Sequence, residues 1–151
     1  MSDKKEKARQ LFLEGYNCSQ AVLGAFCEDL GLPFEMALKI SSSFGGGMGR
    51  MREVCGALSG AFMAAGLKCG YASTDDNDAK AKHYKLIQTM AAEFKKENGS
   101  IICRELLDID SSQKQSHIPD NRTVEFYKKR PCVQLVEIAA EIAEKAILGE
   151  I

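Results

Sequence analysis

The residues of this chain best suited to chemistry are its six cysteines. A thiolate is both the nucleophile of disulfide exchange and a strong ligand for soft metals. No two of these cysteines have the Cys-x-x-Cys spacing of thioredoxin-like motifs and zinc fingers. A cysteine site in this chain must therefore be assembled from distant segments.

Four of the six cysteines share one predicted position, the first turn of a helix. The first turn carries unpaired backbone N–H groups and the positive end of the helix dipole, and both lower the pKa of a thiol placed there. Three of the four also have an arginine close in sequence, which would act in the same direction. The four are Cys18, Cys55, Cys103 and Cys132, and the arginines are Arg52, Arg104 and Arg130.

The same four cysteines fall on predicted apolar helix faces, so they could converge on one site. Cys18, for example, shares a stripe with Val22 and Ala25. Free cysteine is also among the most buried residue types, and the alternative that these thiols only fill space stays open. Cys27 points away from the face of Cys18, and Cys69 lies at a predicted helix C-terminus, so neither is expected in the site.

Helix-like segments separated by breakers occupy most of the chain, and no segment reads as a convincing strand. The glycine-rich segment 44–49 and the polar segment 108–122 are predicted to be loops. The sequence predicts one all-α domain over residues 1–151, a helical bundle of about six to seven helices. Its main helices are expected over residues 4–14, 17–30, 33–42, 52–68, 74–98 and 131–147, with short helical stretches near 100–107 and 123–129.

Charge and hydropathy exclude some classes of partner. The chain has 20 basic and 21 acidic residues, which gives no electrostatic reason to expect a nucleic acid. The longest apolar stretch, 54–67, is too short to span a bilayer, and residues 1–10 are polar, unlike a signal peptide. We therefore expect a cytoplasmic protein without membrane insertion, whose cysteines are not permanent disulfides.

Other familiar motifs are not met. The glycine-rich segment lacks the Gly-Lys-Ser/Thr of a phosphate-binding loop, and Arg50 replaces the last glycine of Gly-x-Gly-x-x-Gly. A tight turn that brings backbone N–H groups near the thiols is the better interpretation of Gly45, Gly46 and Gly47. His83 and His117 have no partner at metal-ligand spacing, so solvated or packing roles are expected for them.

The cysteine layout resembles that of the C_GCAxxG_C_C family, which is described as redox-active. The resemblance covers the chain from about residue 15 to the last predicted helix. It rests on the segment Cys55-Gly56-Ala57-Leu58-Ser59-Gly60, on Cys18 within Gly15-Tyr16-Asn17-Cys18-Ser19-Gln20, on the later Cys103 and Cys132, and on the glycine run Phe44-Gly45-Gly46-Gly47. It implies a redox role, with a redox or electron-transfer protein as partner.

Three hypotheses follow for the four-cysteine site. The first is a thiol–disulfide oxidoreductase without a cofactor, in which a second cysteine resolves the mixed disulfide. Cys55 is the preferred nucleophile, with Arg52, Gly56, Gly60 and the glycine run in supporting positions.

The second hypothesis is a metal site in which Cys18, Cys55, Cys103 and Cys132 hold zinc or an iron–sulfur cluster. The third is a non-enzymatic interaction domain with inert buried thiols. Homo-oligomerisation, the substrate and the disulfide pairing are not specified by the sequence.

Overall fold

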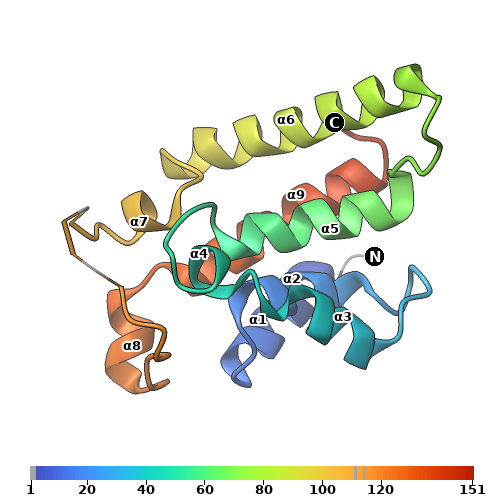
Figure 1. Cartoon of the computed structure of the whole chain (residues 1–151). Coiled ribbons are helices and arrows are strands. Elements are labelled where there is room, and N and C mark those ends of the chain that lie inside the picture. The colour runs from blue at the N-terminus through green and yellow to red at the C-terminus, as the bar shows by residue number, and fades with distance from the viewer. Residues whose placement is uncertain (1–2, 111, 114) are drawn as a thin grey trace.

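Helices form where the chain supplies a capping side chain, a turn residue or an apolar stripe. The computed structural model describes residues 3–110, 112–113 and 115–151. Asn17 caps the second helix with a complete capping box, in which its side chain and that of Gln20 each accept the other's backbone N–H. The helices are α1 (Lys4–Leu13), α2 (Cys18–Phe26), α3 (Phe34–Ser42), α4 (Gly45–Met48), α5 (Gly56–Cys69), α6 (Asn77–Asn98), α7 (Cys103–Leu106), α8 (Val124–Lys129) and α9 (Cys132–Ile147) (Figure 1).

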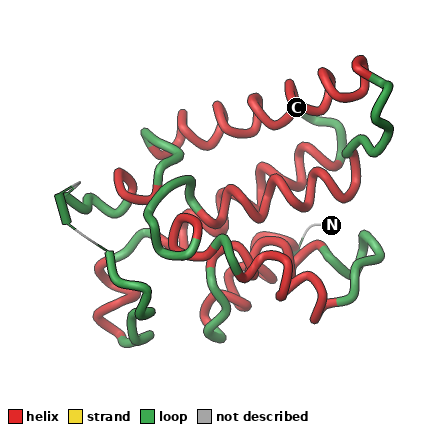
Figure 2. Tube along the Cα trace, viewed as in Figure 1, coloured by secondary structure: helices red, strands yellow, loops and turns green. Residues whose placement is uncertain are grey.

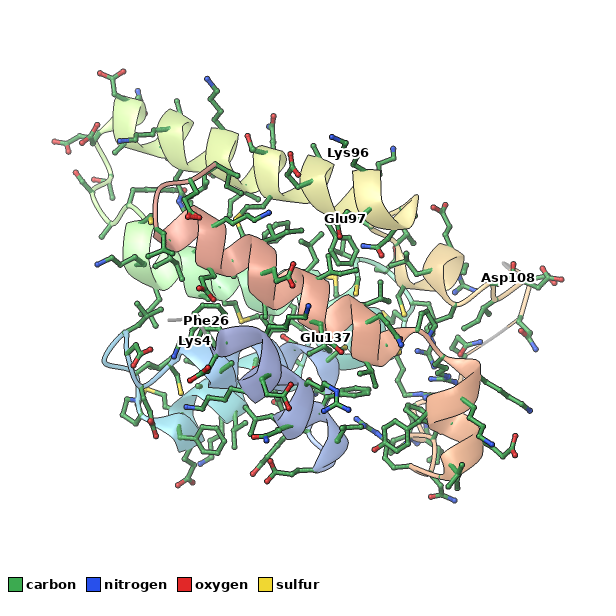
Figure 3. The ribbon with its side chains drawn as sticks, turned by 180° about the vertical axis from the view of Figure 1, so that it is seen from behind. Lys4, Phe26, Lys96, Glu97, Asp108 and Glu137 are labelled. Carbon is green, nitrogen blue, oxygen red and sulfur yellow. The ribbon has the colours of Figure 1, made fainter. Side chains whose placement is uncertain are left out.

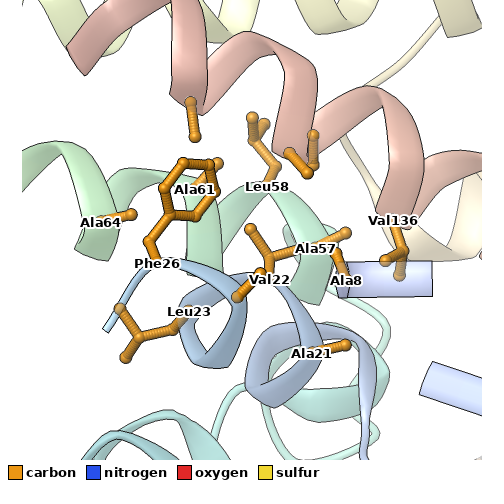
Figure 4. Close-up of a cluster of buried hydrophobic side chains, with 14 of the residues drawn as sticks. Ala8, Ala21, Val22, Leu23, Phe26, Ala57, Leu58, Ala61, Ala64 and Val136 are labelled. Atoms are coloured by element: carbon orange, nitrogen blue, oxygen red, sulfur yellow. The ribbon is translucent and has the colours of Figure 1, made fainter. Parts of the chain in front are cut away.

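The core is built around the small-residue face of α5, which packs against α2 and α9, while α1 packs against the same two neighbours. Ala57, Ala61 and Ala64 of α5 are fully buried and lie beside Val22 and Phe26 of α2 (Figure 4). Small side chains let the helix axes approach closely. Buried apolar area of this kind is the main stabilising contribution to folding.

Helix α6 lies along the outside of this core and is attached by few side chains. Only Met90 and Phe94 of its residues are buried. The other faces carry exposed charged side chains such as Glu97 and Lys96, and Lys96 lies on the outer side of the helix (Figure 3). The C-terminal end of α6, closed by Gly99 in the left-handed conformation, leads directly into the segment before α7.

The all-α prediction is confirmed. None of the described residues forms a strand, and the tube view shows helices and loops alone (Figure 2). Within the described residues no helix is long and apolar enough to cross a membrane. In the described part of the chain, six helices have nine residues or more and three are shorter, close to the expected six to seven.

Several predicted helix starts are wrong by a few residues. The helix expected from residue 52 begins at Gly56, because Arg52 adopts a left-handed backbone with φ of 62° and Cys55 is the N-cap. The helix expected from residue 74 begins at Asn77, because Asp76 is the N-cap and accepts the N–H of Ala79. The predicted 100–107 helix shortens to α7, which begins at Cys103.

Two glycines of α5 provide a matched test of close packing. A Cβ added to Gly60 would lie 2.7 Å from the carbonyl oxygen of Ser19, whereas one added to Gly66 would have its nearest neighbour, Nε2 of His83, at 3.9 Å. We expect Gly60→Ala to lower the free energy of unfolding by about 1–3 kcal/mol. Gly66→Ala should raise it by about 0.5–1 kcal/mol, since alanine is the better helix former.

Urea unfolding of both variants, followed by circular dichroism, measures these changes. Equal effects of the two substitutions would contradict the close approach of α5 to α2.

Candidate functional site

Two backbone segments that are distant in sequence pair with each other and bring Cys55 close to Cys103. Val54 and Ile102 form an isolated antiparallel bridge. On either side of it, the N–H of Cys55 donates to the carbonyl of Ile101 at 2.8 Å, and the N–H of Cys103 donates to the carbonyl of Glu53 at 2.6 Å. The start of α5 and the start of α7 are therefore held together by main-chain hydrogen bonds.

The glycine-rich segment is a left-handed turn that packs under this bridge. Residues 46–50 all have positive φ, although two of them, Met48 and Arg50, are not glycine. A Cβ on Gly47 would lie 2.6 Å from the Cβ of Cys103, so only glycine permits this approach. The predicted loop is thus correct in character, although one short turn of it, α4, has helical hydrogen bonding.

The structure brings the four predicted site cysteines together around one pocket. They lie at the starts of α2, α5, α7 and α9, and the pocket between them has a volume of about 310 Å³. Cys55 and Cys103 are buried, with 5% and 8% of their surface exposed, and Cys18 and Cys132 are half-buried. All four are free thiols.

Burial opposes ionisation of three of these thiols. It raises the pKa of Cys55 far above its usual range and raises the pKa of Cys132 to about 12, and the nearby Cys18 adds to both shifts. Burial also raises the pKa of Cys18, although the N–H groups of Gly46 and Ser19 partly offset it. The helix-start N–H groups act in the predicted direction, but removal of water from the thiols outweighs them.

Arg52 donates a hydrogen bond to a site sulfur, and this sulfur is not the one that sequence proximity indicates. Its guanidinium is 2% exposed, and Nη1 donates to Sγ of Cys103 at 3.7 Å, although Cys55 is nearer in sequence. Arg104, the sequence neighbour of Cys103, donates instead to backbone carbonyls, including that of Met51 at 3.5 Å. Arg130 is near Cys132 as expected and lowers its pKa slightly against the effect of burial.

An arginine cluster around one carboxylate also lines the pocket. Oδ2 of Asp120 lies 2.9 Å from Nη1 of Arg50, 2.8 Å from Nη2 of Arg130 and 3.7 Å from Nη2 of Arg52. The hydrogen bond from Arg50 lowers the pKa of Asp120. Sequence analysis missed Asp120 and the role of Arg50, because an aspartate in a polar loop has no distinguishing pattern.

A further arginine, Arg122, fixes the polar loop against the N-terminal helices. It donates to the carbonyl oxygens of Phe12 at 2.9 Å and Tyr16 at 2.8 Å, and its guanidinium stacks 4.2 Å from the ring of Phe12. His117 also lines the pocket, and it is exposed, which fits the solvated or packing role expected for it. The loop is therefore part of the site, not a surface connection alone.

The remaining predicted residues divide between the pocket and its support. Gly45, Gly46 and Gly56 line the pocket, and Gly56 lies directly against the sulfur of Cys18. Gly60 is one turn further along α5 and packs on α2. The two cysteines excluded from the predicted site lie outside the pocket: Cys27 donates to the carbonyl of Gly24 at 3.3 Å, and Cys69 is exposed at the end of α5.

The described side chains do not form a preassembled set of metal ligands. Across residues 3–110, 112–113 and 115–151, no three histidine, cysteine, aspartate or glutamate side chains are grouped as they would be to hold a metal ion. Zinc or an iron–sulfur cluster on Cys18, Cys55, Cys103 and Cys132 therefore stays a prediction of the sequence.

Comparison with known proteins agrees with the cysteine layout. Residues 16–146 match the family model C_GCAxxG_C_C, whose description reads "Putative redox-active protein". The matched region contains all four pocket cysteines. No curated protein and no solved structure matches the chain.

The raised pKa of Cys132 makes stability depend on alkaline pH. An ordinary thiol titrates near 9, and Cys132 in the folded protein titrates near 12. Above pH 9 the unfolded chain loses a proton that the folded protein keeps, so stability falls as the pH rises. Each such thiol contributes at most about 1.4 kcal/mol per pH unit.

Urea unfolding between pH 8.5 and 10.5, with a phosphine reductant present, should therefore show a shallower decline in Cys132→Ser than in the natural protein. Cys69→Ser is the matched control, because its thiol is exposed. Identical slopes in the two variants would refute the effect of burial.

Proposed function

Because the chain belongs to the C_GCAxxG_C_C family of redox-active proteins, we propose that its pocket exchanges thiols with a disulfide substrate. The observation that carries the proposal is the buried guanidinium of Arg52 beside the sulfur of Cys103. A cation next to a sulfur favours the thiolate, which is the nucleophile of disulfide exchange. The other three thiols lie around the same pocket, so a resolving partner is at hand.

Cys103 replaces Cys55 as the attacking residue. Cys55 has no described arginine on its sulfur, and burial raises its pKa far above the range in which a thiolate forms readily. Cys18 is the resolving residue of the proposal. It is half-buried, the N–H of Gly46 donates to its sulfur, and Cys103 is close enough to contribute to the raised pKa of Cys18.

The reaction balances without a cofactor. The Cys103 thiolate attacks one sulfur of a substrate R–S–S–R, so that a Cys103–S–S–R bond forms and one R–S⁻ leaves. The Cys18 thiol then gives up its proton to solvent and attacks Sγ of Cys103, which releases the second R–S⁻ and leaves a Cys18–Cys103 disulfide. Two electrons pass from the protein to the substrate. The reverse direction oxidises a dithiol partner.

Removal of the charge of Arg52 should slow the chemistry of Cys103. We expect Arg52→Met to reduce the alkylation rate of Cys103 by iodoacetamide at pH 7.5 about tenfold, which corresponds to a loss of about 1.4 kcal/mol of thiolate stabilisation. Mass spectrometry of the separate cysteine peptides gives the rate at each residue. Arg104→Met is the matched control, because that guanidinium donates to backbone carbonyls. Equal rates in both variants would remove Arg52 from the mechanism.

Trapping of the mixed disulfide tests the assignment of the two cysteines. With bis(2-hydroxyethyl) disulfide as a neutral substrate, Cys18→Ser should accumulate the hydroxyethylthio group on Cys103, and the natural protein should form a Cys18–Cys103 disulfide. Peptide mapping distinguishes these products. A label on Cys55 would reassign the nucleophile. If no pocket cysteine is modified faster than the exposed Cys69, the exchange proposal is wrong.

A further inference from the structure

The pocket that holds the four cysteines also carries a large excess of positive charge. Four arginines line it, and Asp120 is the one acidic residue among the described lining residues. Arg50 and Arg130 share the single oxygen Oδ2 of that carboxylate. Arg122 is held by carbonyl oxygens and aromatic rings, which leave its charge in place.

One of these guanidinium groups has an unused donor. Arg52 is 2% exposed, Nε donates to Gln115 at 3.1 Å, and Nη1 donates to the sulfur of Cys103. Its Nη2 is buried and has no hydrogen-bond partner among the described residues, since Oδ2 of Asp120 at 3.7 Å is too distant. An unpaired buried donor on a charged group is costly, so it calls for an acceptor.

We propose that the pocket binds the anionic group of a small disulfide or thiol substrate, a carboxylate, sulfonate or phosphate, at Nη2 of Arg52. The inference rests on the proposed exchange function and specifies the class of its substrate. Arg52 then has two roles on adjacent nitrogens: Nη2 holds the anion and Nη1 holds the attacking sulfur. A volume of about 310 Å³ admits a small molecule but no folded partner.

The geometry links binding to reaction. An anion bound at Nη2 is held close to the sulfur of Cys103, because Nη1 of the same planar guanidinium donates to that sulfur. Bidentate or paired contacts to arginine are the usual means of holding such groups. A substrate with the same disulfide but no charge would enter the pocket without this anchor.

Sulfate binding tests the anion site without any thiol chemistry. Calorimetric titration with sodium sulfate, against sodium chloride at equal ionic strength, should show saturable binding to the reduced protein. Arg52→Gln should weaken that binding at least tenfold, and Arg9→Gln, which removes a partly exposed arginine of α1 outside the pocket, should leave it unchanged. Absence of saturable binding, or equal affinity of both variants, would overturn the proposal.

A second measurement uses the natural protein, so that it does not depend on the folding of Arg52→Gln. The anionic reagent sulfonatoethyl methanethiosulfonate and the cationic trimethylammonioethyl reagent modify thiols by the same reaction. The ratio of their rates at Cys103 should exceed the ratio at Cys69 at least tenfold. Equal ratios would overturn the anion site. Sulfate binding without exchange of bis(2-hydroxyethyl) disulfide would refute the exchange function alone, and exchange without sulfate binding would refute the anion site alone.

Discussion

The short backbone pairing of residues 52–55 with 101–104 is the interaction on which the site depends. It consists of few hydrogen bonds, yet it joins the entrance of α5 to the entrance of α7 across nearly fifty residues of chain. A helix alone positions a side chain only relative to its own axis. Here the main-chain bonds of Cys55 and Cys103 fix two helix starts against each other, and the remaining two cysteines approach through the packing of α2 and α9 on α5.

The chemistry of the pocket is set by a competition between two effects of the same location. A helix start offers N–H groups to a thiolate, while a helix start inside the core removes the water that would otherwise solvate it. Removal of water has the larger effect at Cys18, Cys55 and Cys132, so the pKa of each of these thiols is raised. Among the described residues, Cys103 is the pocket cysteine whose sulfur accepts a hydrogen bond from a guanidinium, that of Arg52.

Sequence reasoning identified the helices and the cysteines because both have local signatures. The apolar stripe of α9 and the capping box at Asn17 are visible in a short window, and the four helix-start cysteines follow from them. The pairing of Val54 with Ile102 has no such signature, and neither has the ion pairing of Asp120 with arginines up to seventy residues away. For the same reason Arg52 was assigned to Cys55, its neighbour in sequence, and not to Cys103, its neighbour in space.

The left-handed turn at residues 46–50 and the isolated left-handed Arg52 have a stereochemical consequence. An L-residue other than glycine is strained there by about 1–2 kcal/mol, whereas its D-enantiomer would adopt the same angles in its relaxed form. The chain thus places a chiral residue, Arg52, at a position where achiral glycine would be conformationally easier. The backbone beside Cys103 therefore has, over these residues, the handedness that a D-residue prefers, and the buried Arg52 is one of them.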